Sequence, residues 1–376
     1  MPVYLDNAAT TKPCDEAVSA LNTCLTTIYG NPSSLHIMGL DAEKEILAAR
    51  RQIGDAIGTE YINIFFTSGA TESNNLAIFG TVNANKRRGN KIITTDIEHQ
   101  SVHSPLSYLE ENGYDIVRIR TVDGQIDEDE LIDAVDDRTI LVSAMLVNNE
   151  SGSIQPIGKV FRTLKRRYPQ LITHCDAVQA FCKIPMRASA LNADLISISA
   201  HKIHGVKGVG ALYIKKGVRI LPMIHGGGQE SGLRPGTESV PLIAAFGEAV
   251  RIGSEKIDEN YDHVSKLSSY AKAELQKLDD ISINMFHEHS PYIMNFSVKG
   301  IRSEIMLHFL EEKGIFVSSG SACAKGKKSR VLEAFGIEDS AIDSAIRISF
   351  SKYNTMNDID KLISGIKDGQ GRLLRS

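Results

Sequence analysis

The chain has 376 residues, 42% hydrophobic and 23% charged, which is enough for two hydrophobic cores and typical of a soluble globular protein. Its net charge of −4 lacks the basic excess of proteins that bind nucleic acid directly or adhere to an anionic membrane. No apolar run approaches the roughly 20 residues of a membrane span, and the amino terminus has no basic region or cleavage site, so we expect a cytoplasmic protein.

Short apolar runs alternate with helical patterns between about residues 60 and 215. This alternation predicts an α/β fold with a mainly parallel central sheet covered by helices on both faces. In such sheets, ligands bind beyond the carboxyl ends of the strands. We expect the strands at residues 63–67, 91–95, 114–118, 140–145, 171–175, 195–199 and 210–214.

The pattern changes after residue 240. A long helical stretch to about residue 278 is followed by mixed strand and helix patterns, which indicate a smaller α+β domain. We expect these elements at residues 291–297, 304–312, 315–317 and 345–349. The expected division is a large domain of residues 13–255 and a small domain that combines residues 1–12 with residues 256–376.

Polar residues follow several of the predicted strands. Because the carboxyl ends of parallel strands meet at one edge of a sheet, these residues are expected to share one site. They lie at residues 68–72, 96–99, 148–150, 176 and 199–202.

Lys202 and Asp176 are the most informative of these residues. Each ends an apolar run, and Gln179 lies one helical turn after Asp176. Alone, such a lysine is usually a solvated charge and such an aspartate a turn or helix cap. Together they supply a lysine that can form a Schiff base and an acid that can pair with a pyridinium nitrogen, as pyridoxal phosphate (PLP) chemistry requires.

Small residues at positions 67–71 follow a predicted strand and precede a helical pattern. They would let backbone N–H groups and the helix amino terminus approach a phosphate, with the Thr71 hydroxyl as a further donor. The alternative is an ordinary strand-to-helix turn with a Ser or Thr cap.

His99 is expected to begin a helix, with His103 one turn later. Two histidines at this spacing can chelate zinc, but the order is not H-E-x-x-H and a third ligand is not obvious. We therefore expect no metal, and favour a histidine that stacks on a flat cofactor and moves protons near neutral pH. The glycines at 205–210 and 226–228 do not match a dinucleotide-binding motif and are interpreted as turns.

Cys323 lies in the small, polar and basic segment 318–329, where nearby lysines favour its thiolate. The segment is interpreted as a mobile loop that carries a nucleophile. The odd number of cysteines and the absence of a C-x-x-C pair argue against a disulfide framework or a zinc ribbon. The other cysteines are expected to pack as small hydrophobic residues, at positions 14, 24, 175 and 182.

Arg347 lies within the apolar pattern 345–349 and would be costly to bury without a partner. A substrate carboxylate could accept two hydrogen bonds from its guanidinium. An ion pair with an Asp or Glu of the small domain is an equally good interpretation.

These motifs together resemble the cysteine desulfurases of the NifS/IscS type, within the class-V aminotransferases of PLP fold type I. The resemblance covers nearly the whole chain. It implies a homodimer that converts L-cysteine to L-alanine and passes the sulfur, held as a persulfide on Cys323, to an acceptor protein for iron–sulfur clusters, tRNA thiolation or thiamine. The matching segments are 4–11, 30–36, 66–77, 98–99, 147–150, 176–179, 199–202, 226–230, 234–237 and 318–323.

The resemblance also implies residue roles. Lys202 would hold PLP covalently, Asp176 would pair with its ring nitrogen and Gln179 with its ring oxygen. His99 would stack on the ring. The phosphate ligands would be Ala70, Thr71, Ser199 and His201, with Thr237 from the other subunit. Asn149 would contact both cofactor and substrate, and the remaining substrate ligands would be Arg347, Asn7 and Ala8.

The loop after Cys323 departs from the family pattern, because it is shorter and more basic. The identity of the acceptor therefore stays open. The alternative functions are a selenocysteine lyase of the same fold and a non-catalytic sulfur-relay protein. A metal-dependent or dinucleotide enzyme is the most remote interpretation.

Overall fold

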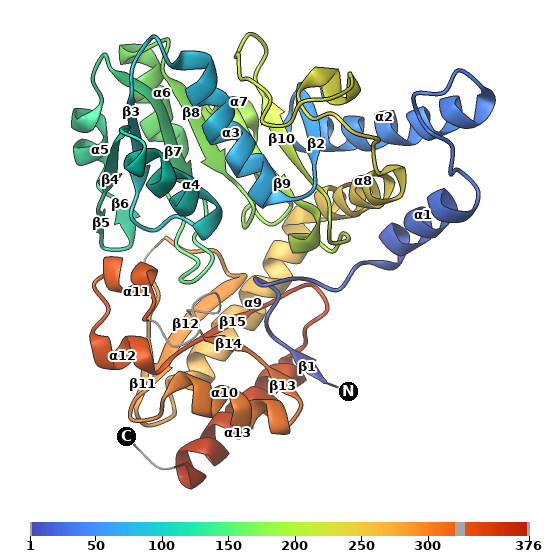
Figure 1. Cartoon of the computed structure of the whole chain (residues 1–376). Coiled ribbons are helices and arrows are strands. Elements are labelled where there is room, and N and C mark those ends of the chain that lie inside the picture. The colour runs from blue at the N-terminus through green and yellow to red at the C-terminus, as the bar shows by residue number, and fades with distance from the viewer. Residues whose placement is uncertain (1, 287, 320–327, 374–376) are drawn as a thin grey trace.

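The computed structural model describes residues 2–286, 288–319 and 328–373. Its main element is a seven-stranded sheet in the order β2-β10-β9-β8-β7-β3-β4 (Figure 1). Six of its seven strands run in the same direction and β10 runs in the opposite one, so the predicted mainly parallel sheet is confirmed. The strands are β2 (Ile64–Thr67), β3 (Lys91–Thr95), β4 (Asp115–Ile119), β7 (Thr139–Met145), β8 (Ile172–Asp176), β9 (Leu195–Ser199) and β10 (Gly210–Ile214).

The central strands of this large sheet are buried on both faces. Ile92 and Leu141 pack in a cluster with α3 (Ala70–Asn85) and α4 (Gln100–Glu111), whereas Ile93 and Val142 pack in the cluster on the opposite face. Burial on both faces explains why these strands are apolar almost without interruption. The second cluster contains residues of α1 (Asp15–Thr26), α2 (Ile37–Ile57), α6 (Ile157–Arg167) and α8 (Val240–Glu255).

Three of the polar residues inside these strands are paired with one another. The two ring nitrogens of buried His174 lie 2.8 Å from Ser143 Oγ and 2.9 Å from Ser197 Oγ. Burial lowers the pKa of His174 to about 4, so the imidazole is neutral. Ser143 and Ser197, which interrupt the apolar pattern, are therefore hydrogen-bonding partners of His174 within the sheet.

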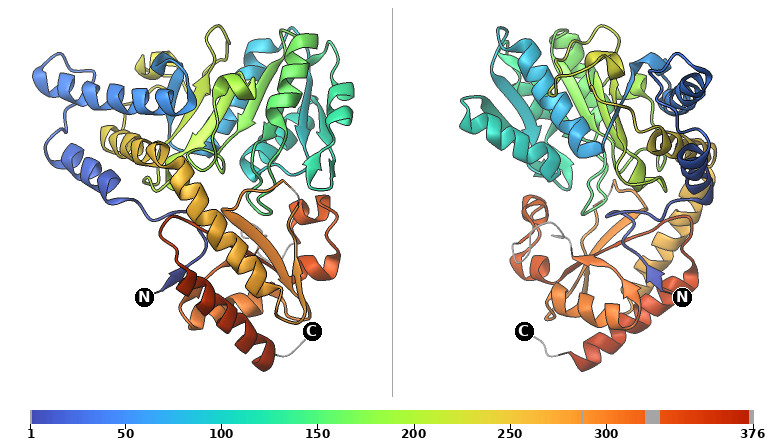
Figure 2. Two further views of the ribbon diagram at one scale, coloured as in Figure 1. Left: turned by 180° about the vertical axis from the view of Figure 1, so that it is seen from behind. Right: turned by 45° about the vertical axis from the view of Figure 1, so that its right-hand side comes forward.

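A second sheet lies below the large one in Figure 2, in the order β11-β12-β15-β14 with antiparallel pairing. The N-terminal β1 (Val3–Tyr4) pairs with β13 (Ile315–Phe316) beside it. Both belong to a separate hydrophobic cluster. Its other elements include β11 (Ile281–Ile283), β12 (Ile293–Val298), β15 (Ala345–Ser349), α9 (Ile257–Leu275), α10 (Ser303–Glu312) and α13 (Met356–Arg372), and β14 (Ser318–Ser319) completes the sheet.

The helical stretch expected from residue 240 to about 278 is divided in two. Lys256, between α8 and α9, has φ −123° and ψ 23°, which is outside the helical range. The apolar pattern continues across the break and does not reveal it. Because α8 packs in the large cluster and α9 in the small one, we propose the domain boundary at this residue.

The remaining elements are short and lie around these two layers. None of the helices in the described ranges combines the length and apolar character needed to cross a membrane. The short elements are η1 (Tyr61–Asn63), β5 (Thr121–Val122), β6 (Gln125–Ile126), α5 (Glu128–Ala134), α7 (Ala188–Leu191), η2 (Ala200–Lys202), η3 (Gln229–Gly232), α11 (Arg330–Ala334) and α12 (Asp339–Asp343).

Candidate active site

A cavity of about 720 Å³ opens at the carboxyl ends of the large sheet. Its size is that of a typical small-molecule site. The strand-end residues therefore gather at one place, although their individual roles remain predictions. The predicted site residues that line it are Ala8, Ala70, Thr71, His99, Asn149, Asp176, Gln179, Ser199, His201, Lys202 and Arg347.

Two predicted site residues are placed elsewhere, and a third is not among the described residues. The Asn7 side chain is buried and donates to Ser349 O at 2.8 Å, so it fastens the N-terminal segment and does not line the cavity. Thr237 is exposed outside the cavity. Cys323 lies outside the described residues.

One end of the cavity is formed by Gly69 and the amino terminus of α3. The first N–H groups of a helix have no partners within it and form a site for anions. A Cβ on Gly210 would lie 2.7 Å from Ile198 O and 2.8 Å from Gly69 backbone atoms, so only glycine permits this close approach. The neighbouring Ser199 Oγ is buried and has no hydrogen-bond partner in the described ranges. The free N–H groups at the start of α3, the Ser199 hydroxyl and the cavity beside them therefore suit a phosphate.

Asp176, the last residue of β8, is held by two donors. Its Oδ2 accepts from Asn74 Nδ2 at 2.9 Å and its Oδ1 from Val178 N at 3.0 Å. Asn74 Nδ2 is also 2.8 Å from Ser101 Oγ, which is 2.8 Å from His99 Nδ1. The carboxylate and the imidazole are therefore connected through Asn74 and Ser101. Neither was singled out from the sequence, because no local pattern reveals that α3 and α4 bring them together.

His99 is the N-cap of α4, as predicted. Burial and the Lys202 charge lower its pKa, while Asp176 opposes the shift. Because Ser101 N donates to His99 Nδ1 at 3.1 Å, the proton of the neutral ring belongs on Nε2. No group of three or more potential metal ligands occurs in the described part of the chain.

Lys202 Nζ donates to Ala8 O and to Ala9 O, each at 2.7 Å. Gln179 Nε2 donates to the same Ala8 O at 2.9 Å, and its Oε1 accepts from Lys183 Nζ at 2.8 Å. A carbonyl oxygen can only accept, so Ala8 O fixes which way the Gln179 amide points and leaves Oε1 facing Lys183.

Lys183 is buried and was not among the predicted site residues. Burial, together with the charges of Lys202 and Arg347, lowers its pKa to about 7. Its position one helical turn after Gln179 was the only available signal. The imidazole of His201 is neutral, since burial and nearby lysines lower its pKa to about 4.

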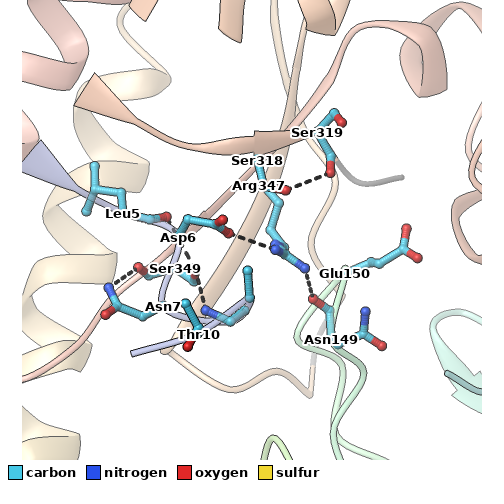
Figure 3. Close-up of polar contacts among 12 residues, drawn as sticks. Leu5, Asp6, Asn7, Thr10, Asn149, Glu150, Ser318, Ser319, Arg347 and Ser349 are labelled. Atoms are coloured by element: carbon cyan, nitrogen blue, oxygen red, sulfur yellow. Dashed lines mark hydrogen bonds and ion pairs between the residues drawn. The ribbon is translucent and has the colours of Figure 1, made fainter. Parts of the chain in front are cut away.

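Arg347 lies on β15 with only 5% of its side chain exposed. Figure 3 shows its two contacts: Nη2 donates to Asp6 Oδ1 at 2.8 Å and Nη1 donates to Asn149 O at 2.9 Å. Its Nε is buried without a partner in the described ranges. The ion pair expected as one alternative is therefore present, and part of the guanidinium remains for a ligand.

Cys14, Cys24, Cys175 and Cys182 are buried free thiols, as expected from their apolar surroundings. Burial raises the pKa of the Cys175 thiol well above its usual range, and Asp176 and Glu98 raise it further. These thiols are therefore protonated and act as small hydrophobic residues.

A family model described as aminotransferase class-V matches residues 3–362. A NifS/IcsS protein homolog of Lactobacillus delbrueckii subsp. bulgaricus is 39% identical, covering 97% of this chain and 96% of the relative. The cysteine desulfurase IscS of Methanosarcina thermophila is also 39% identical, with coverage of 97% and 91%.

Two solved structures agree with this assignment. A NifS-like protein has a TM-score of 0.95 and 38% identity, covering 99% of this chain and all of the other. A structure described as SspA in complex with cysteine has a TM-score of 0.83 and 31% identity, with coverage of 94% and 99%. The resemblance inferred from the motifs is confirmed. The chain belongs to the class-V aminotransferase family, among the cysteine desulfurases of the NifS/IscS type.

Proposed function

We propose that the protein is a PLP-dependent cysteine desulfurase that converts L-cysteine to L-alanine and transfers the sulfur to an acceptor protein. The observation that carries the proposal is the meeting of Lys202, Asp176 and Arg347 in one cavity. Relatives named cysteine desulfurase IscS, at 39% identity over nearly the whole chain, support the same activity.

The residues of the cavity fit PLP. The amino terminus of α3 and the unpartnered Ser199 hydroxyl suit its phosphate. Asp176, oriented by Asn74, suits the pyridinium nitrogen, and the Gln179 amide suits the ring oxygen. When bound, PLP would supply the electron sink that lets the bonds of an amino acid break.

Lys202 and His99 would handle the protons. Lys202 Nζ, held at the carbonyls of Ala8 and Ala9, would take the proton from the α-carbon of cysteine. His99 is neutral with its proton on Nε2, the nitrogen that is not engaged by Ser101, so it can donate there. Arg347 would bind the substrate carboxylate, assisted by Asn149.

Cys323 would accept the sulfur. Its thiolate attacks the sulfur of cysteine, so that an S–S bond forms on Cys323 while the substrate C–S bond breaks, and the remaining carbon skeleton gains a proton to become alanine. Support comes from both flanks of its segment: Ser318 is in register with Arg347, and Ser329 Oγ donates to Glu150 Oε2 at 2.5 Å. The segment thus starts and ends near the cavity.

We further propose a homodimer. A band of exposed apolar side chains extends over α1, α2 and their connection, and a second copy would remove it from water. Thr237, exposed outside its own cavity, could then reach the partner's phosphate site. The band comprises Val18, Leu25, Tyr29, Leu35, Ile37, Met38 and Leu40. Sedimentation of a monomer with full activity would contradict this arrangement.

The test is a visible spectrum of the purified protein before and after addition of L-cysteine, coupled to assays for sulfide and alanine. We expect a yellow chromophore that changes with L-cysteine. Cys323→Ala should keep the chromophore and lose sulfur release. A colourless protein after reconstitution with PLP would refute the proposal, and preferential turnover of L-selenocysteine would favour the lyase.

A further inference from the structure

The N-terminal segment of residues 6–9 contacts two of the groups used in the proposed function, on which this inference rests. Ala8 and Ala9 accept hydrogen bonds from Lys202, and Asp6 pairs with Arg347 (Figure 3). Asp6 is itself well anchored, because it bridges to Ser349 and its carbonyl accepts from Ala9 N at 3.0 Å. The segment is therefore a fixed part of the cavity wall.

The contacts of Arg347 determine how its guanidinium is oriented. A guanidinium has five N–H donors in one plane. Asp6 Oδ1 takes one from Nη2 and Asn149 O takes one from Nη1, while Nε has no partner among the described residues. Two acceptors bonded to different nitrogens fix the orientation of the guanidinium plane. With Asn149 O as the single acceptor, the guanidinium could turn about that one hydrogen bond.

We propose that Asp6 is a positioning residue for Arg347. Its carboxylate fixes the guanidinium plane, so that the remaining N–H donors meet the carboxylate of the amino-acid substrate. Two-point recognition of a carboxylate tolerates an angular error of only about 10–20°. Asp6 also compensates a cation whose side chain is only 5% exposed.

The negative charge of Asp6 has an opposite effect, because it weakens the attraction of Arg347 for a second anion. The Asp6 side chain is 22% exposed, so water screens part of this repulsion. Within the described ranges Nη2 donates to no protein acceptor other than Asp6, so removal of Asp6 leaves Asn149 O as the one protein acceptor that orients the guanidinium. Positioning should therefore exceed repulsion, and the sign of the change in affinity distinguishes the two effects.

The experiment compares two amines that differ in the carboxylate alone. L-alanine and ethylamine are titrated into the PLP-loaded protein, its Asp6→Ala variant and its Asp6→Asn variant, and binding is followed by the cofactor absorbance. In Asp6→Ala we expect L-alanine to bind about tenfold more weakly, equivalent to one lost charge-assisted hydrogen bond, while ethylamine binding is unchanged. Asp6→Asn keeps an oxygen acceptor and should recover most of the affinity.

Unchanged or tighter binding of L-alanine by Asp6→Ala would overturn the proposal, and so would an equal loss for ethylamine. A loss in Asp6→Asn as large as that in Asp6→Ala would contradict the hydrogen-bond argument. Failure of the unaltered protein to respond to either amine would instead refute the proposed function. Thermal melting of each variant identifies a general loss of folding.

Discussion

The two sides of the cavity are built differently. On the cofactor side, formed by α3, α4 and the ends of β8 and β9, Asp176 and His99 are connected through neighbouring residues of one layer. On the substrate side, the partners of Arg347 lie 341 and 198 residues away, at Asp6 and Asn149. The cofactor side is held mainly within one sheet and its helices, although Lys202 and Gln179 also bond to the N-terminal segment. The substrate side exists only where three distant segments meet. Substitutions on the two sides should therefore impair cofactor retention and carboxylate affinity, respectively.

The largest expected effect is on the cofactor side. Lys202→Ala removes the amine that would hold the cofactor and move the proton, so turnover of L-cysteine should fall by more than about 10³-fold. Absorbance after dialysis should also show loss of the cofactor. Lys207→Ala is the matched control, because Lys207 lines the same cavity and takes no part in the proposed reaction. Turnover retained by Lys202→Ala would show that the cofactor side has been assigned wrongly.

The difference between the two sides also explains what the sequence could predict. Apolar runs that end in polar residues predicted the strands, the shared edge and the residues Asp176, His99 and Lys202, because strand periodicity and the strand-end rule are local. Asn74 was missed because hydrogen bonds between elements leave no local pattern. Lys183 was missed because its spacing from Gln179, four residues away, does not show that the amine is buried. Arg347 was recognised as costly to bury, but its partner Asp6 is known only when the chain has folded.

A second prediction tests whether the cofactor side depends on close backbone packing. A Cβ on Gly210 would meet the backbone of Ile198 and Gly69 at 2.7–2.8 Å, and neither backbone can yield freely. Gly210→Ala should destabilise the protein by about 1–3 kcal/mol and weaken PLP binding about tenfold. Asp6→Ala, on the substrate side, should bind PLP as tightly as the unaltered protein when PLP is added to the cofactor-free form. Urea unfolding measures the change in stability, and titration of the cofactor-free protein with PLP measures the change in affinity.

Gly371→Ala provides the control for that substitution, because a Cβ there meets nothing within 4 Å. It lies in α13, away from the cavity, and alanine favours a helix. PLP affinity of Gly210→Ala equal to that of Gly371→Ala would remove the argument that Gly210 shapes the phosphate site.

A third prediction concerns the buried amine of Lys183 behind Gln179. The pKa of Lys183 is lowered from 10.5 to about 7 in the folded protein, so between these values the unfolded chain binds more protons and stability rises with pH. The slope contributed by this group is at most about 1.4 kcal/mol per pH unit. Lys183→Met should lack this rise in stability with pH. Urea unfolding of both proteins at pH 7.5 and 9.5 measures the difference. Lys352→Met, at the same small space beside Lys183, should retain the slope of the unaltered protein.

The smallest expected effect lies behind the substrate side, at Glu150, the residue after Asn149. Burial raises the pKa of this carboxyl from 4.5 to about 7, although the Ser329 hydroxyl and the charges of Arg347 and Arg330 oppose the shift. Between these pH values the folded protein holds a proton that the unfolded chain has lost, so stability falls as pH rises. Glu150→Gln is neutral throughout and should lose less stability between pH 5 and 7.5, by about 1 kcal/mol. An equal loss of stability in the two proteins between pH 5 and 7.5 would show that Glu150 is ionised in the folded state, so that its contact with Ser329 is a charged hydrogen bond.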